Sequence, residues 1–427
     1  MEVTDVQYKE SEIGVIPVDW NVKKISDFSK PVRGGSPRPA GSPLYFNGDY
    51  IPWLTVAALT NISSSQIFVS ETEGFLTQLG SEYSRTLEKD TLIIANSGAT
   101  LGVAKLLAIK CCANDGIAAL NNFSREVDKA YVVYYINSIT QKLREVVATG
   151  NGQPNLNTTL IGDLRIPLPP TKSEQTAIAT ALSDTDALIE NLEKLIAKKR
   201  NIKQGVMQEL LTGRKRLEGF STEWRYSTLS KFVADKKFAI VDGPFGSQMK
   251  VQDFVEQGIP IVEMEHLKNK FLEPDKLDRY ITHKKFEELI RSSVFPDDII
   301  ISKTGSLGYI SIVPSSIEKA LITSRLAKIT LDKKKANISF VFQCLARLRE
   351  IEYWQRTAQG GTMLILSIAN ISHAPIPDIS IYEQKEIADI LDTMDNDIER
   401  LEQILNKYNM IKQGMMQALL TGKIRLA

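Results

Sequence analysis

Cysteine and histidine are scarce in this 427-residue chain, which has three of each. Cys111 and Cys112 are adjacent and Cys344 is distant, so no Cys-x-x-Cys or Cys/His spacing suggests a zinc site or a redox pair. Buried free thiols are the simpler interpretation, since free cysteine usually behaves as a small hydrophobe. The histidines lie in no His-Glu-x-x-His motif and in no Ser/Asp partner pattern. We therefore expect neither a metal nor a cofactor.

Long apolar runs are also missing. No stretch approaches the roughly 18 uninterrupted apolar residues that a membrane span needs, and the opening MEVTDVQYKE lacks the apolar core of a signal peptide. We expect a cytoplasmic protein without membrane contact.

Catalytic motifs are likewise missing. The chain has no GxxxxGK[ST] phosphate loop, so the KTGSLG segment at Lys303 is interpreted as a strand followed by a turn. No NPP[FY] or DPP[FY] tetrapeptide of an amino-methyltransferase is present. The segment FPDDIIISK at Phe295 resembles a metal-dependent nuclease motif, but Ile301 stands where a carboxylate ligand is needed. We expect a protein that is not an enzyme.

An excess of charge of one sign is absent too, because 52 basic residues face 51 acidic ones and the net charge is +1. The net charge of the whole chain therefore does not indicate nucleic-acid binding. The segment from Lys194 to Arg216 is locally basic, and a solvated helix face explains such a run more simply than a binding site does.

What the chain does contain is an internal repeat. The 44 residues from Glu174 align without a gap on those from Glu383, and about half are identical. The offset is constant at 209 residues, as between Lys203 and Lys412 of the two KQG motifs. Such a match exceeds what shared helical composition provides, so the segment is duplicated.

Both copies are predicted to form long helices. Seam positions recur in alternating steps of four and three, as in a coiled coil, and are hydrophobic except at Thr185 and Lys199, which interrupt the first seam. They are Ile178, Leu182, Thr185, Ile189, Leu192, Ile196 and Lys199 in the first copy and Ile387, Leu391, Met394, Ile398, Leu401, Leu405 and Tyr408 in the second. Each copy ends in LLTG, where Gly213 and Gly422 suit a left-handed C-cap. Antiparallel pairing would bury both seams; packing of each helix on its own domain is the alternative.

The regions before the two helices resemble each other more weakly, in the same order. DWNVKKISDF around Trp20 matches EWRYSTLSKF around Trp224, and DTLIIANSGATLG at Asp90 matches DIIISKTGSLG at Asp298. Short β-branched runs ending in turn residues predict strands, and the later segments have helical periodicity, so each domain is mixed α and β. Tyr353 and Trp354 could stack on bases, although an aromatic pair at a helix end more often belongs to the core.

These features together resemble the specificity subunit of type I restriction-modification enzymes. The resemblance rests on a GVIPxxW-like start at Gly14, followed by IPLPP, SEQ, a long helix, KQG, MQ, LLTG and RL, with most of this block repeated. It implies an α+β fold in which two target recognition domains (1–170 and 214–379) alternate with two long antiparallel coiled-coil helices (171–213 and 380–427). It also implies sequence-specific binding of double-stranded DNA at a bipartite, asymmetric target, with two methyltransferase subunits and restriction/translocase subunits as partners.

Candidate DNA-contacting residues follow from turn composition and from the match between repeats, because glycine-rich turns let backbone N–H groups approach phosphates. In the first domain they are Arg33, Gly34, Ser36, Arg38, Asn96, Ser97, Thr100 and Gln153; in the second they are Phe245, Gly246, Ser247, Gln248, Lys303, Thr304, Ser306, Arg325 and Gln359.

Two alternative functions stay open. A coiled-coil scaffold could present globular domains that bind proteins rather than DNA. A self-sufficient methyltransferase or nuclease is the other, and the missing motifs disfavour it.

Overall fold

The computed structural model describes residues 7–63, 65–98, 100–147, 155–361 and 364–426. The chain divides into two compact units, and each unit combines one of the predicted recognition domains with parts of both long helices. Unit 1 contains Met1–Ile196 and Leu401–Ala427, and unit 2 contains Ala197–Arg400. In the described ranges, no helix combines the length and the apolar character that a membrane span requires.

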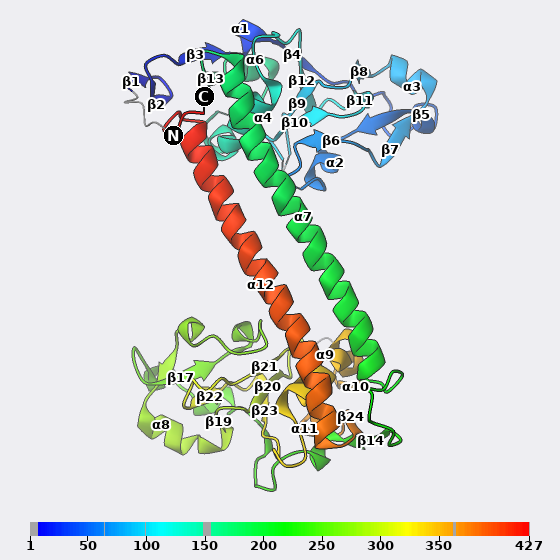
Figure 1. The fold of residues 1–427 in the computed structure, drawn as a ribbon, viewed down its shortest axis with the longest axis vertical. Coiled ribbons are helices and arrows are strands. Elements are labelled where there is room, and N and C mark those ends of the chain that lie inside the picture. Colours follow the sequence, from blue (N-terminus) through cyan, green and yellow to red (C-terminus); the bar gives the residue numbers. More distant parts are fainter. Residues whose placement is uncertain (1–6, 64, 99, 148–154, 362–363, 427) are drawn as a thin grey trace. The chain divides into compact units, whose positions relative to one another are not determined.

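The N-terminal part of unit 1 is built around two sheets (Figure 1). The five-stranded sheet has the order β4-β12-β9-β10-β6, and the four-stranded sheet has the order β7-β5-β11-β8. The strands are β4 (Lys30–Arg33), β5 (Phe46–Leu54), β6 (Phe68–Val69), β7 (Gly74–Leu76), β8 (Arg85–Leu87), β9 (Leu92–Ala95), β10 (Ala104–Leu107), β11 (Cys111–Ala113) and β12 (Ile117–Asn121). Two short pairs, β1 (Tyr8–Ser11) with β2 (Gly14–Pro17) and β3 (Asn21–Lys24) with β13 (Arg165–Leu168), complete the strands.

The helices of unit 1 lie against both sheets, and the two longest cover one face of the five-stranded sheet. They are α1 (Ile25–Phe28), α2 (Val56–Thr60), α3 (Gln78–Glu82), α4 (Lys129–Ser138), α5 (Thr140–Lys142), the π-helical turn η1 (Leu143–Val147), α6 (Thr158–Gly162) and the start of α7 (Lys172–Leu210). Leu92 and Ile94 of β9 belong to the core shared with α4 and α7, whereas Ile93 and Ala95 belong to the core between the two sheets. The strand is therefore buried on both faces, which explains its continuous hydrophobic run.

Unit 2 repeats this architecture. Its four-stranded sheet, β15-β23-β20-β21, corresponds to β4-β12-β9-β10, and its five-stranded sheet, β16-β18-β17-β22-β19, contains the counterparts of β7-β5-β11-β8. The strands are β14 (Arg225–Thr228), β15 (Ile240–Asp242), β16 (Phe254–Val255), β17 (Ile259–Val262), β18 (Tyr280–Ile281), β19 (Ser293–Val294), β20 (Ile299–Ser302), β21 (Ile310–Ile312), β22 (Ala320–Ile322), β23 (Leu326–Ile329) and β24 (Pro375–Asp378). The predicted strands LIIA and IIIS are thereby confirmed as β9 and β20.

The helices of unit 2 follow the same scheme. They are α8 (His283–Glu288), α9 (Ile338–Glu350), α10 (Tyr353–Thr357), α11 (Ile368–Ser372) and the start of α12 (Ile381–Leu419), with short 3₁₀ turns η2 (Leu229–Lys231), η3 (Gly246–Gln248), η4 (Val251–Asp253), η5 (Met264–His266), η6 (Pro274–Lys276) and η7 (Ile290–Ser292). Trp354 is fully buried in the unit 2 core and Tyr353 packs against it. The pair is therefore a core feature, and Trp354 offers no face on which a base could stack.

Within each unit, the first half of one long helix runs antiparallel to the second half of the other (Figure 1). In unit 1, Asp186 pairs with Lys412 and Glu174 pairs with Arg425. In unit 2, Asp395 pairs with Lys203 and Glu383 pairs with Arg216. The predicted antiparallel pairing is therefore confirmed, although each helix also packs on its own domain through its first turns.

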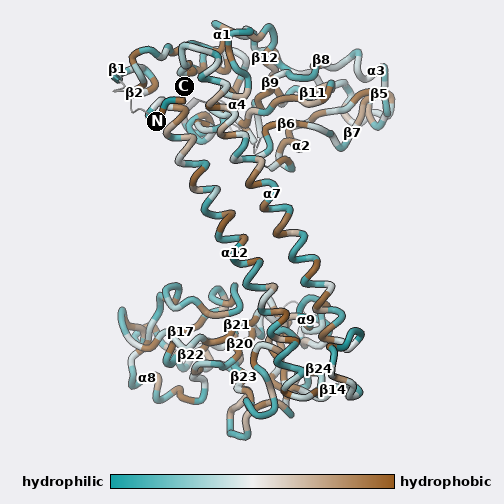
Figure 2. Tube along the Cα trace, viewed as in Figure 1, coloured by the Kyte–Doolittle hydropathy of each residue, from teal (hydrophilic) through white to brown (hydrophobic). Residues whose placement is uncertain are grey.

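Both long helices show the seam and the terminal glycine that the repeat predicts. All predicted seam residues are buried or half-buried, and hydrophobic and hydrophilic residues alternate along α7 and α12 (Figure 2). Gly213 and Gly422 both have a φ of 71°, which confirms the predicted left-handed caps. A Cβ at Gly213 would lie against Trp224, and one at Gly422 would lie against Pro17 and Trp20. Each LLTG motif therefore ends its helix and packs on a domain at once.

Candidate nucleic-acid interface

Four segments meet at the end of the five-stranded sheet in unit 1. They are the loop after β4 (33–38), the turn after β9 (96–98), the turn between β11 and β12 (114–116), and residues 155–156; we call them the first loop cluster. Main-chain hydrogen bonds join them, from the Gly34 N–H to the Ile117 carbonyl (2.8 Å), from the Asn96 N–H to the Gly116 carbonyl (2.9 Å), and from the Leu156 N–H to the Asn96 carbonyl (2.8 Å).

Unit 2 builds the same framework from the loop after β15 (242–248), the turn after β20 (303–306), the turn between β22 and β23 (323–325), and residues 359–361 and 364–366. These segments form the second loop cluster. The corresponding N–H groups of Gly243, Lys303 and Leu366 donate to the carbonyls of Leu326, Arg325 and Lys303, respectively, at 2.8 to 3.1 Å. Both clusters therefore share one main-chain arrangement.

A glycine is required at the same place in each cluster. A Cβ at Gly34 would lie 2.1 Å from the Asn114 carbonyl oxygen, and one at Gly243 would lie 2.1 Å from the Thr323 carbonyl oxygen. The two glycines are 209 residues apart, which is the offset of the helical repeat. Gly34 was among the candidate residues named from the sequence, whereas Gly243 was not, and the candidates in its loop were residues 245–248.

Asp115 is the centre of the first loop cluster. Its carboxylate accepts a hydrogen bond from the Ser36 hydroxyl (2.7 Å) and lies 3.7 Å from the Arg38 guanidinium. Its carbonyl oxygen accepts hydrogen bonds from Arg33 Nε (2.6 Å) and Asn96 Nδ2 (3.3 Å). The structure thus brings together four of the predicted side chains, around a residue that was not among them.

The remaining candidates of the first domain differ in exposure. Ser97 is half-buried, whereas Asn96 and Thr100 are only 2% and 9% exposed. Arg33 and Arg38 are exposed. Gln153 lies outside the described residues. The side chains that this cluster offers to a ligand are therefore chiefly the two arginines.

The second loop cluster also contains a carboxylate, Asp242, but at a different position, the end of β15. Its Oδ2 lies 2.9 Å from Lys303 Nζ, and its Oδ1 lies 2.6 Å from an Arg291 guanidinium nitrogen. Lys303 occupies the position of Asn96, and Asp242 occupies that of Arg33. The two clusters therefore share their backbone, but the charge differs at both matching positions and is opposite at the Arg33/Asp242 position.

The other candidates of the second domain are spread over all four segments of this cluster. Phe245, Gly246, Ser247 and Gln248 form an exposed 3₁₀ turn, in which the Gln248 side chain accepts a hydrogen bond from the Phe245 N–H. Thr304 and Gln359 both form β-bridges to Ile365, and the Ser306 carbonyl accepts from the Ser302 hydroxyl. Arg325 is exposed. Phe245, with 70% of its surface exposed, is the most accessible apolar side chain of the set.

Sequence reasoning missed both carboxylates. Each aspartate is followed by glycine, as Asp115-Gly116 and Asp242-Gly243, and this dipeptide is a strong turn signal. A search for Asp-Gly at strand ends would have identified them.

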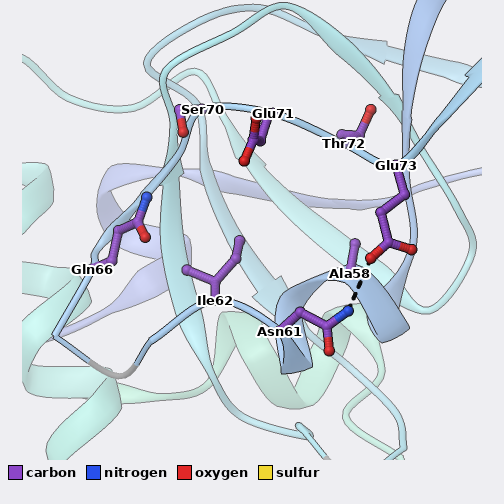
Figure 3. Close-up of a pocket in the computed structure, with 8 residues that line it drawn as sticks. All are labelled: Ala58, Asn61, Ile62, Gln66, Ser70, Glu71, Thr72 and Glu73. Carbon is purple, nitrogen blue, oxygen red and sulfur yellow. Dashed lines mark hydrogen bonds between the residues drawn. The ribbon is translucent and has the colours of Figure 1, made fainter. Parts of the chain in front are cut away.

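A separate surface pocket of about 340 Å³ lies beside α2 in unit 1 (Figure 3). Its lining includes Gln66, Glu71 and Glu73, and Asn61 Nδ2 donates to Glu73 Oε1 at 3.0 Å. None of the predicted DNA-contacting residues lines it. Two carboxylates at its rim would repel phosphate, so we do not include it in the interface.

The chain matches a family model described as type I restriction modification DNA specificity domain, over residues 17–199 and 248–409. It belongs to this family of specificity subunits. The putative MjaX specificity subunit of Methanocaldococcus jannaschii is 27% identical over 98% of this chain and 97% of that protein, and the MjaVIII specificity subunit of the same organism is 24% identical over 98% and 96%.

Solved structures agree on the fold of the specificity subunit. The crystal structure of a type I restriction-modification S subunit from M. genitalium has a TM-score of 0.61 and 18% identity, covering 98% of each chain. A chain from a study of complex assembly in the type I system has a TM-score of 0.57 and 14% identity, covering 96% of this chain and 99% of that one. The predicted α+β fold with two repeated domains and long helices is thereby confirmed.

Proposed function

We propose that this specificity subunit reads a bipartite, asymmetric target in double-stranded DNA and directs partner subunits to it. The proposal rests on the two loop clusters, which have one main-chain framework and different side chains. A shared framework suits one mode of approach to a duplex, since main-chain and phosphate contacts set register. Different side chains on it should select different bases, because base edges are distinguished by hydrogen-bond pattern.

The chemistry is proposed to lie in the partners. Two methyltransferase subunits would supply methyl transfer, and restriction/translocase subunits would supply cleavage. The chain itself contains neither the amino-methyltransferase tetrapeptide nor a phosphate loop. Incubation of the isolated chain with DNA and a labelled methyl donor should give no transfer, whereas the reconstituted complex should; transfer by the chain alone would refute this assignment.

The asymmetric target can be tested by mapping modified bases. The chain and its modification subunit would be expressed in a host without adenine or cytosine methylation of its own, and modified positions would be located by single-molecule sequencing. We expect one motif with two unlike defined parts separated by unspecified bases. A palindromic or continuous motif would contradict the proposal.

Direct binding separates DNA recognition from a protein-binding scaffold. The reconstituted complex should retard a duplex containing the mapped motif more strongly than a scrambled duplex, and the affinity should fall as salt rises because phosphate contacts release counterions. Failure of the complex to bind duplex DNA at any salt concentration would favour the protein-binding scaffold as its function.

A further inference from the structure

Asp242 holds two cations that come from different parts of unit 2. Lys303 belongs to the turn after β20, and Arg291 belongs to the 3₁₀ turn before β19. The carboxylate contacts Lys303 through Oδ2 (2.9 Å) and Arg291 through Oδ1 (2.6 Å). Lys303 is 14% exposed and Arg291 is 47% exposed, so the group lies at the surface with the lysine the more enclosed of the two.

The position of this carboxylate is itself fixed. The Asp242 carbonyl accepts a hydrogen bond from the Ser292 hydroxyl at 2.9 Å, and the residue pairs with Ala327 in the sheet. Gly243 then packs against the Thr323 carbonyl with no room for a side chain. Lys303 is also held at its main chain, by hydrogen bonds to Arg325 and Leu366. Only the lysine and arginine side chains are left to be positioned.

A carboxylate on a DNA-facing surface weakens DNA binding because it repels phosphates, unless a favourable effect compensates for this repulsion. Lysine and arginine side chains have many rotamers, and ordering them opposes binding. Fixing them in the free protein removes part of that cost before DNA arrives. A carboxylate that bridges two cations can therefore strengthen specific binding even though it lowers the net positive charge.

We propose that Asp242 is a positioning residue, which sets Lys303 and Arg291 in place for contact with the phosphates and base edges of one half-site. This inference rests on the proposed DNA-reading function. Asp242 acts through the two cations and does not itself contact the DNA.

The first loop cluster supports the same principle with other segments. Asp115 contacts Ser36 and Arg38 through its carboxylate, and it holds Arg33 through its carbonyl oxygen. The carboxylate comes from the β11–β12 turn here and from the end of β15 in unit 2. Each cluster therefore has one aspartate beside two cations, at different positions on a common backbone.

The test is Asp242→Asn in the complex reconstituted from the full chain and its modification subunit. Affinity would be measured for the mapped motif and for a duplex with one half-site scrambled, at several salt concentrations. If Asp242 positions the cations, cognate affinity falls by about tenfold, comparable to the loss of one good base contact. Affinity for scrambled DNA stays equal or rises, because one negative charge is gone. Equal or tighter binding of the cognate duplex would overturn the proposal.

Three further variants exclude a merely structural effect. Asp378→Asn removes another ion pair of unit 2, with Lys231, and should leave discrimination unchanged. Asp242→Glu should recover part of the cognate affinity. In a Lys303→Ala, Arg291→Ala background, Asp242→Asn should have no additional effect; an undiminished effect there would also overturn the proposal. Thermal unfolding of each variant shows whether unit 2 remains folded.

The outcomes separate this inference from the proposed function. A wild-type complex that does not distinguish cognate from scrambled DNA would refute the function itself. A wild-type complex that discriminates, together with an Asp242→Asn complex that discriminates equally well, would refute the positioning role alone.

Discussion

At the scale of single residues, the most unusual group is a lysine inside unit 1. Lys105, on β10, is 2% exposed, and its ammonium donates to the Ser63 carbonyl at 2.9 Å and to the Gln66 carbonyl. Burial, reinforced by the nearby Lys412 and opposed by Asp186, lowers the pKa of Lys105 to about 8. Nothing in the sequence indicates that the lysine of the AKLL run is buried, since lysine is usually exposed.

This shift makes the stability of unit 1 depend on pH. Since the pKa of Lys105 is depressed on folding, the unfolded chain binds more protons between about pH 8 and the usual value of 10.5, and stability rises with pH across that window. Below about pH 8 the contribution is constant. Urea unfolding of the wild type and Lys105→Met should therefore give a stability difference that changes by about 3 kcal/mol across the window.

A surface lysine provides the control. Lys110 is exposed and pairs with Glu88, so Lys110→Met should follow the wild type more closely over the same pH range. A difference between wild type and Lys105→Met that is flat from pH 8 to 10.5 would show that Lys105 keeps an ordinary pKa.

At the scale of elements, the repeat places a matching aspartate–lysine ion pair between the two long helices in each unit. Asp186 contacts Lys412 at 2.5 Å and accepts from the Tyr134 hydroxyl at 2.8 Å. In unit 2, residues 209 positions away take the same places: Asp395, Lys203 and Gln343. The environments differ, because Asp186 is 5% exposed and Asp395 is 28% exposed. Burial raises the pKa of Asp186 although Lys412 and Tyr134 oppose the shift.

The two lysines should therefore respond unequally to the same substitution. Lys412→Met leaves a carboxylate buried without its cation, which should cost unit 1 about 3 kcal/mol. Lys203→Met leaves a partly hydrated carboxylate, and the cost to unit 2 should be about 1 kcal/mol. Hydrogen exchange measured separately over the two units would report each loss.

A Lys412→Met, Asp186→Leu double variant tests the cause. Removing both charges should recover much of the stability that Lys412→Met loses, because the penalty comes from the unpaired carboxylate. Equal losses for the two single lysine variants would show that burial of the partner carboxylate does not decide the cost.

The same elements show what sequence can and cannot predict. Helix existence, the seam and the LLTG caps were predictable because they follow from local periodicity and from glycine at a fixed place. The loop clusters were only partly predictable. Asp115 and Asp242 gain their partners from segments far away in the chain, and Asn96 looks like an exposed turn residue although it is buried. Such properties depend on tertiary contacts that a single sequence does not encode locally.

At the scale of the whole molecule, unit 1 is discontinuous in sequence. It needs Leu401–Ala427, which are separated from its other residues by all of unit 2. Leu419 and Leu420 belong to its core, and Arg425 contacts both Asp19 and Glu174. The guanidinium holds the pKa of Asp19 below its usual range, so this contact favours the charged carboxylate. The stability of unit 1 therefore depends on residues 401–426.

A chain truncated after Arg400 tests that dependence. Loss of Leu419 and Leu420 alone removes about 3–6 kcal/mol of hydrophobic stabilisation, against a typical domain stability of about 5–15 kcal/mol. Removal of Lys412 also leaves Asp186 buried without its cation. Limited proteolysis followed by mass spectrometry should thus find new cleavage sites in unit 1, while unit 2 stays protected as in the full chain. A peptide of residues 401–427 added in trans should restore protection of unit 1, because the missing contacts are non-covalent. Equal protection of both units in the truncated chain would show that unit 1 folds without the C-terminal half of α12.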